Sequence, residues 1–235
     1  MKAILKRELK SYFSSPIGYV CVAVLLAIFG INFYQVMGSG VSSGVAGVYG
    51  TMFFFCIIII PILTMKSMSE DRHNKTDQAL LTAPVGVTSI VLGKFLAAFC
   101  VYAIAMVGSL VPVFIISCFT TNFGWAVVFG NLLGSLFYGA ALIAIGVFIS
   151  GLTESQVIAA IGTFAISMVF MVMDPLASMA SNAVLTTVVG WISFYARYQP
   201  FTQGMFNISS VVFFISVAAI FVFLAARKLE SKRWS

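Results

Sequence analysis

EDRHNKTDQALLTAP, residues 70–84, is a charged stretch that separates two long apolar runs of the chain. Six of the twenty charged residues lie between Lys66 and Asp77. A charged side chain at the centre of a bilayer costs about 2.5–3.5 kcal/mol on insertion scales, so this stretch belongs in water. The apolar runs on both sides belong in hydrocarbon. The stretch therefore predicts a wet loop between two membrane-spanning helices.

The composition of the whole chain agrees with a membrane protein. Of 235 residues, 61% are hydrophobic and 9% are charged, whereas soluble domains carry about 25% charged residues. The chain has a formal charge of +6, but its basic residues lie at the ends of apolar segments rather than on one face of a soluble fold, which argues against a nucleic-acid partner. We therefore expect an all-α integral membrane protein with one domain over residues 1–235.

Six apolar segments are long enough to cross a bilayer, which takes about 20 residues. They are residues 17–37, 48–65, 90–118, 125–150, 155–173 and 207–226. Residues 175–196 also lack charge, so a seventh span is the alternative. With six spans, twelve of the thirteen Lys and Arg residues lie on the cytoplasmic side and only Arg197 lies outside, as the positive-inside rule requires.

Six spans predict a multi-pass protein of the cytoplasmic membrane with both termini in the cytoplasm. Residues 175–205 then form an extracytoplasmic helical segment, partly re-entrant or interfacial. Within the fourth span, Gly130 and Gly134, and then Ser135 and Gly139, recur at a spacing of four. Small residues at this spacing allow a neighbouring helix to approach closely.

The first fourteen residues alternate basic and bulky apolar side chains. This pattern predicts a helix that lies in the headgroup layer, with bases toward anionic lipid and rings toward the acyl chains. The residues expected to anchor it are Lys6, Arg7, Lys10, Tyr12 and Phe13. The alternative is a frayed, solvated tail.

Solvation explains the charges of the loop at residues 70–84, but it does not explain the apolar residues Ala79, Leu80 and Leu81. Within a short helix that begins near Thr76 or Asp77, the leucines form a compact apolar surface, and Pro84 ends the helix. An exposed apolar surface on a polar stalk suggests insertion into the groove of a partner.

Three stretches together resemble the type-2 ATP-binding-cassette permeases, in particular the subgroup of the gliding-motility and nitrous-oxide-reductase maturation transporters. They are SEDRHNKTDQALLTAPVGVTSIVLGKFLAA (69–98), LKRELKSYFSSPIGYV (5–20) and the carboxyl-terminal residues from FYARYQPFTQG (194–204) onward. The chain departs from the family pattern at Lys75, Gln203 and Ser210. The resemblance implies a coupling helix at residues 76–83 that docks on a cytoplasmic nucleotide-binding ATPase, two of which serve each complex. It also implies a second permease copy or homologue.

The expected contact with the ATPase comprises Glu70, Asp71, Arg72, Thr76, Asp77, Leu80, Leu81 and Pro84. The chain itself lacks a phosphate-binding loop, because Gly93-Lys94-Phe95 has neither the earlier glycine nor the following Ser or Thr. We therefore expect no bound cofactor, no metal site and no catalysis in this chain, with ATP and Mg²⁺ held by the partner. Lys94 is close enough to the end of its span to extend toward the headgroups.

The expected function is that of a permease subunit that exports a hydrophobic or lipid-like substrate, because the spans contain few charges and the chain has 23 phenylalanines. The alternative is a mechanical force transmitter from the ATPase to an extracytoplasmic partner that contacts residues 175–205. The polar residues that could line a pathway are Asn32, Gln35 and Asn131. Single amides in spans also form interhelical hydrogen bonds, which is the other interpretation.

Overall fold

The computed structural model describes residues 2–39, 44–76, 86–119, 124–179 and 183–231. Within these ranges every regular element is an α-helix. The helices are α1 (Lys2–Ser14), α2 (Pro16–Ser39), α3 (Gly44–Thr64), α4 (Lys66–His73), α6 (Val87–Gly108), α7 (Leu110–Phe119), α8 (Trp125–Ser150), α9 (Gln156–Met179), α10 (Ala183–Ile192), α11 (Phe194–Thr202) and α12 (Ile208–Ser231). Proline stands first in α2, where its missing N–H leaves no hydrogen bond unmade.

Six helical segments of the described chain are long and apolar enough to cross a membrane. They are Pro16–Met37, Ala46–His73, Val87–Cys118, Trp125–Ser150, Gln156–Met173 and Ile208–Ser231. The all-helical class and the number of spanning helices agree with the prediction. The second segment joins α3 to α4 through Met65, and the third joins α6 to α7.

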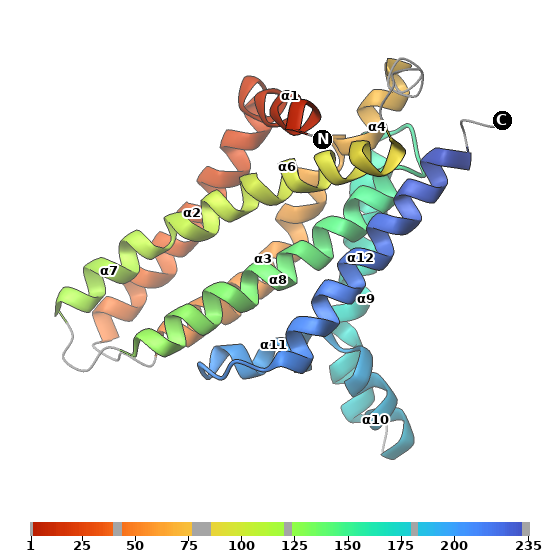
Figure 1. Ribbon diagram of the computed structural model, residues 1–235. Coiled ribbons are helices and arrows are strands. Elements are labelled where there is room, and N and C mark those ends of the chain that lie inside the picture. Colours follow the sequence, from red (N-terminus) through yellow and green to blue (C-terminus); the bar gives the residue numbers. More distant parts are fainter. Residues whose placement is uncertain (1, 40–43, 77–85, 120–123, 180–182, 232–235) are drawn as a thin grey trace.

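Helix α8 lies at the centre of the bundle, and α3, α6, α9, α11 and α12 pack around it (Figure 1). Its glycines permit this contact. A methyl group on Gly134 would lie 2.6 Å from Phe201 Cβ of α11, and one on Gly139 would lie 2.1 Å from Tyr102 Cε1 of α6. The spacing of small residues in the fourth span thus reflects close approach by two neighbouring helices.

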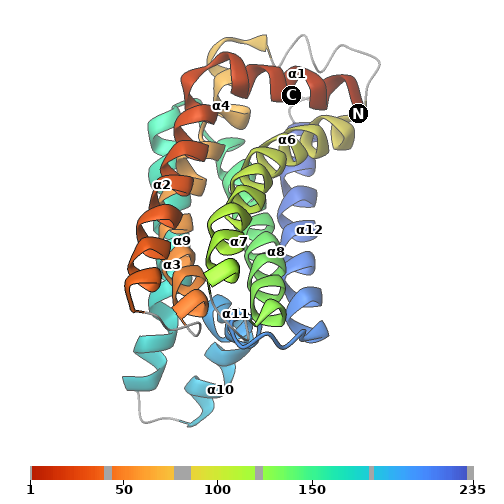
Figure 2. The same ribbon diagram turned by 90° about the vertical axis from the view of Figure 1, so that its left-hand side faces the viewer.

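The two ends of the bundle differ. Helix α1 lies across one end, together with α4 and the end of α12, while α10 and α11 lie at the opposite end (Figures 1 and 2). The predicted outer segment, residues 175–205, therefore consists of the last turns of α9 followed by α10 and α11. Helix α9 continues to Met179, beyond the predicted end of the span at residue 173.

Candidate functional site at the α1 end of the bundle

Helix α4 connects the second span to residues 77–85, which lie outside the described part of the chain. Three predicted coupling residues, Glu70, Asp71 and Arg72, lie on α4, and Thr76 follows its end. The Thr76 hydroxyl donates a hydrogen bond of 2.8 Å to Asp71 Oδ1. The other predicted coupling residues fall outside the described residues: Asp77, Leu80, Leu81 and Pro84. Helix α4 is therefore the element that holds the start of the predicted coupling segment.

A buried lysine holds α4 to two other helices. Lys94 of α6 is 3% exposed, and its Nζ lies 3.2 Å from Glu8 Oε1 of α1. The same ammonium forms an ion pair with the carboxylate of Asp71 on α4 and donates to the carbonyl oxygen of Ser67. Lys94 thus joins α1, α4 and α6, and it does not extend to the headgroups as the sequence suggested.

Arg7 completes the ion-pair cluster, defined here as Arg7, Glu8, Asp71 and Lys94. Arg7 Nη2 lies 2.8 Å from Glu8 Oε1 and 3.6 Å from Asp71 Oδ2. The side chains of Glu8 and Asp71 are 11% and 18% exposed, while Arg7 is half exposed. Two acids and two bases make the cluster formally neutral. Since an uncompensated buried charge is strongly unfavourable, this balance allows the cluster to lie inside the bundle end.

A serine of α8 provides the amino-terminal cap of α4. Ser150 Oγ accepts hydrogen bonds of 3.0 Å from the backbone N–H groups of Met68 and Ser69, and it donates one of 3.1 Å to the carbonyl of Met65. The first N–H groups of a helix have no partner within that helix. Ser150 is completely buried, so no water replaces it. The start of α4 is therefore bonded to the end of α8.

We predict that Ser150→Ala lowers the free energy of unfolding by about 1–2 kcal/mol, because two buried N–H groups lose their acceptor. For a chain of this size that corresponds to a fall in melting temperature of roughly 2–8 °C. The measurement is thermal unfolding of the purified protein in detergent. Ser117→Ala is the matched control, since Ser117 Oγ donates only within its own helix, to the carbonyl of Phe114. Equal shifts for the two variants would contradict the capping role.

Arg72 bonds α4 to the connection between α8 and α9. Its Nη1 donates a hydrogen bond of 2.8 Å to the carbonyl of Gly151, and its Nη2 lies 3.6 Å from Glu154 Oε1. Gly151 lies against Met68, because a methyl group on this glycine would be 3.2 Å from the methionine sulfur. Together with Ser150, these contacts fix α4 on the end of α8.

The predicted interfacial residues of α1 have different environments. Lys6 and Lys10 are exposed, and the ring of Phe13 packs edge-on against Tyr19 with centroids 5.4 Å apart. Tyr12 is buried, and its hydroxyl donates to the carbonyl of Leu63 on α3. Burial raises the pKa of the Tyr12 phenol, and the nearby carboxylate of Glu8 raises it further. The phenol therefore stays protonated and joins α1 to α3.

Two buried tyrosines, one from α8 and one from α11, bond to the backbone of α3. Tyr138 of α8 donates a hydrogen bond of 3.2 Å to the carbonyl of Phe53, and Tyr198 of α11 donates one of 3.4 Å to the carbonyl of Tyr49. Phe53 stacks on the Tyr138 ring with centroids 4.4 Å apart. Phe194 of α11 also packs on this group. The interior between α3, α8 and α11 is thus closed by aromatic rings.

The three polar residues considered for a pathway do not lie together. Asn32 donates to the carbonyl of Ile28 within α2, and Gln35 is exposed on the same helix. Asn131 is buried in α8, and its Nδ2 donates to the carbonyls of Val127 and, at 3.4 Å, of Thr202. The structure therefore places one amide at a contact between α8 and α11 and the other two on α2.

Sequence reasoning missed Glu8 and Ser150 and did not connect Lys94 with Asp71. The partners of Lys94 lie 86 residues before it and on the far side of the loop. One signal was available: an acidic residue within the otherwise basic start of the chain and a lysine one turn inside an apolar span are both unusual. Paired charges are the common solution for such residues.

Comparison with known protein families gives one result for most of the chain. A family model described as "ABC-2 family transporter protein" matches residues 14–227. A comparison with curated proteins finds no match.

Proposed function

The chain belongs to the ABC-2 family of transporter proteins, and on this premise we propose how it couples ATP hydrolysis to movement. Family membership makes the chain a membrane permease subunit that works with a nucleotide-binding ATPase and a second permease. In our proposal, residues 76–83 form a coupling helix, and Leu80 and Leu81 insert into a groove of the ATPase. Closure of the ATPase on nucleotide then pulls α4.

The observation that carries this proposal is the attachment of α4 to its neighbouring helices by ion pairs and hydrogen bonds. A force applied just beyond Thr76 reaches α6 and α1 through the Asp71–Lys94 and Lys94–Glu8 ion pairs. It reaches α8 through Ser150 and through the bond from Arg72 to the carbonyl of Gly151. A loosely attached helix would absorb the displacement, whereas α4 transmits it to two spans, α6 and α8, and to α1. In particular, α8 contacts most of the bundle.

The same proposal assigns the α1 end of the bundle to the cytoplasm of a cell whose inner membrane holds the chain. Helix α4, the start of α1 and the end of α12 lie at this end, and the positive-inside count favours it. Helix α1 then lies in the headgroup layer with Lys6 and Lys10 toward the lipid phosphates. ATP and Mg²⁺ are bound by the ATPase subunits, two per complex, and no cofactor is bound by this chain.

Within this assignment, the substrate is hydrophobic or lipid-like and is exported. The buried surface of the described spans is dominated by aromatic and aliphatic side chains, which offer no polar contacts to a hydrophilic substrate. We also propose that the chain belongs to the subgroup of gliding-motility and nitrous-oxide-maturation permeases, which its three quoted stretches resemble.

The test of coupling is Leu80→Asp combined with Leu81→Asp. We expect the doubly altered permease to lose association with its ATPase and to lose stimulation of ATP hydrolysis, because two carboxylates cannot enter an apolar groove without a large desolvation cost. Asn74→Asp with Lys75→Asp is the matched control, since it adds acid at two exposed positions of the same loop and is expected to retain binding. Co-purification and ATPase stimulation by the leucine variant would overturn the proposal.

The second candidate function is transmission of force to an extracytoplasmic partner without transport. The observation that favours it is the closed aromatic interior between α3, α8 and α11, where Tyr198 of α11 bonds to Tyr49 of α3, the helix that leads into α4. The contact surface would be α10 and α11, where Trp191, Ile192 and Tyr195 are exposed. Tyr198→Phe would then reduce the response of the extracytoplasmic partner while leaving ATP hydrolysis unchanged. In a substrate exporter this variant would not affect the partner independently of ATP hydrolysis.

A further inference from the structure

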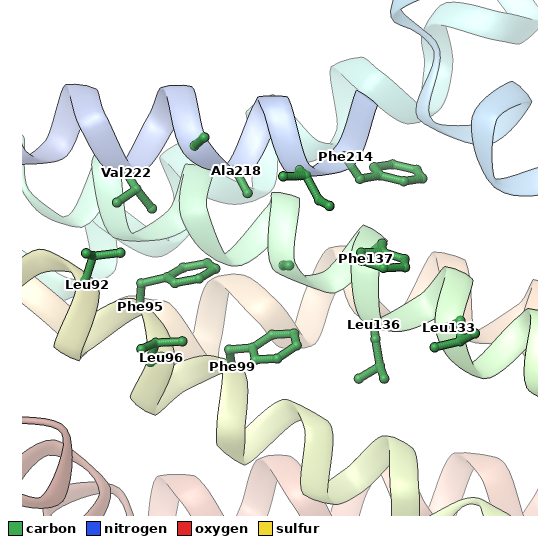
Figure 3. A pocket seen from close by; sticks show the side chains of 13 residues that line it. Leu92, Phe95, Leu96, Phe99, Leu133, Leu136, Phe137, Phe214, Ala218 and Val222 are labelled. Carbon is green, nitrogen blue, oxygen red and sulfur yellow. The ribbon is translucent and has the colours of Figure 1, made fainter. Parts of the chain in front are cut away.

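An apolar groove lies on the outer face of the bundle between α6, α8 and α12 (Figure 3). Leu92, Phe95 and Phe99 of α6 form one wall, Phe137 of α8 forms the floor, and side chains of α12 form the other wall. We propose that this groove holds an acyl chain of an anionic phospholipid, which stays bound as a structural lipid rather than as cargo. The inference does not depend on the proposed function.

The volume and the apolar lining of the groove indicate which kind of molecule fits it. Its volume is about 420 Å³, room for roughly fourteen water-sized groups. All of its lining residues are Leu, Phe, Ala, Ile or Val, and water needs polar partners to remain in a buried site. The groove also lies between three membrane-spanning helices, so its surroundings are hydrocarbon. An acyl chain of a lipid therefore fits the groove better than water does.

The groove has the dimensions of part of one acyl chain. The wall formed by α6 extends over seven residue steps, from Leu92 to Phe99. This is a length of about 10 Å along a helix, or roughly a third of the thickness of the hydrocarbon core. A second copy of this chain is a poorer fit, because a stable interface buries more than about 1,000 Å² over a broad surface. A short concave groove suits a flexible chain better than a helix.

Charge complementarity selects the headgroup. Ile4 of α1 packs against Gly93, where a methyl group would lie 2.8 Å from its Cγ2, and Gly93 adjoins Leu92 at the end of the groove. Lys2 and Lys6 lie two residues before and after Ile4, on the opposite side of α1 from it, and both are exposed and without an ion pair among the described residues. Figure 2 shows this end of α1 above the start of α6 and beside the end of α12. Two free ammonium groups at this level favour an anionic headgroup.

A lipid in this position supports α6, the helix that contributes Lys94 to the ion-pair cluster. Leu92, Phe95 and Phe99 face the groove, whereas Lys94 and Ala98 of the same helix are buried on the inner side. Apolar contact alone gives an acyl chain little preference for the groove over the bilayer, because both surroundings are apolar. Retention therefore depends on shape and on the lysines, which makes it sensitive to the class of lipid.

The test uses the full chain, purified in dodecyl maltoside, delipidated, and then mixed with dioleoyl phosphatidylglycerol or dioleoyl phosphatidylcholine. Phosphatidylglycerol is expected to raise the melting temperature by about 5 °C at saturation, and phosphatidylcholine by less. Ala218→Phe fills the groove, so it is expected to abolish most of the shift by phosphatidylglycerol. Lys2→Ser with Lys6→Ser is expected to remove the difference between the two lipids and to keep the smaller shift.

Val172→Phe is the matched control, because it adds the same ring at an exposed position of α9 and should leave the lipid shift unchanged. Native mass spectrometry provides the second measurement if Ala218→Phe does not fold: wild type retains phosphatidylglycerol, and Leu92→Ala with Phe99→Ala, which widens the groove, retains several-fold less. An unchanged lipid shift in Ala218→Phe, or equal retention by the widened groove, overturns the proposal. So does a loss of dimer in Ala218→Phe, which would assign the groove to a second copy.

Discussion

Lys94→Met is expected to lower the free energy of unfolding by about 3–5 kcal/mol, which is the usual effect of removing one partner of a buried ion pair. The substitution leaves the carboxylates of Glu8 and Asp71 with Arg7 as their only basic neighbour in the cluster, and Arg7 is half exposed. The carbonyl of Ser67 also loses its donor. Thermal unfolding in detergent should show a fall of roughly 6–20 °C, together with a loss of ATPase stimulation.

Two further variants separate the charge effect from the loss of a side chain. Lys10→Met removes an exposed lysine and should change the melting temperature by no more than about 2 °C. Lys94→Met combined with Glu8→Gln and Asp71→Asn should recover most of the stability, because removing all members of a buried ion pair is often close to neutral. Recovery of stability without recovery of ATPase stimulation would assign the cluster a role in transmission. If Lys94→Met is as stable as Lys10→Met, the cluster does not hold the helices together.

Gly139→Ala is expected to cost about 1–3 kcal/mol, because overpacking forces side chains or backbone to move. The added methyl group would lie 2.1 Å from the ring of Tyr102. This ring is buried, and its hydroxyl donates to the carbonyl of Ser135, so it has little freedom to move away. The melting temperature should fall by roughly 2–12 °C.

Gly30→Ala is the control with the opposite expected sign. A methyl group on Gly30 meets nothing within 4 Å, and alanine is favoured over glycine in a helix by up to about 1 kcal/mol. The melting temperature should stay the same or rise. If both glycine substitutions lower it equally, helix propensity and not close packing between α6 and α8 explains the glycine at position 139.

The ion-pair cluster and Ser150 give the same helix two kinds of attachment. The lysine binds α4 through charge, which neutralising substitutions weaken, whereas the serine binds it through neutral hydrogen bonds in a buried site. Both attachments lie within one turn or two of the predicted coupling segment. The proposed function requires such a junction, because in that proposal the spans receive energy through contact with the ATPase.

The sequence by itself determined the membrane class, the six spanning segments and the difference in charge between the two ends of the bundle. Each of these follows from about 20 neighbouring residues, because transfer into hydrocarbon depends on the composition of a segment and not on its partners. The spacing of four between Gly130 and Gly134, and between Ser135 and Gly139, was also readable, since it indicates close approach without identifying the neighbouring helix. The resemblance to transporter permeases added the expected partner.

Only the tertiary structure decided which side chains meet. A span that is apolar around its whole circumference has no polar face to indicate which side points inward. Lys94 therefore looked like a residue at a membrane surface, and Ser150 was not singled out at all. Folding brings Glu8, Asp71 and Lys94 together from three separate helices. Their roles arise from these long-range contacts, because a charge buried in the low dielectric of the bundle is strongly unfavourable unless an opposite charge lies beside it.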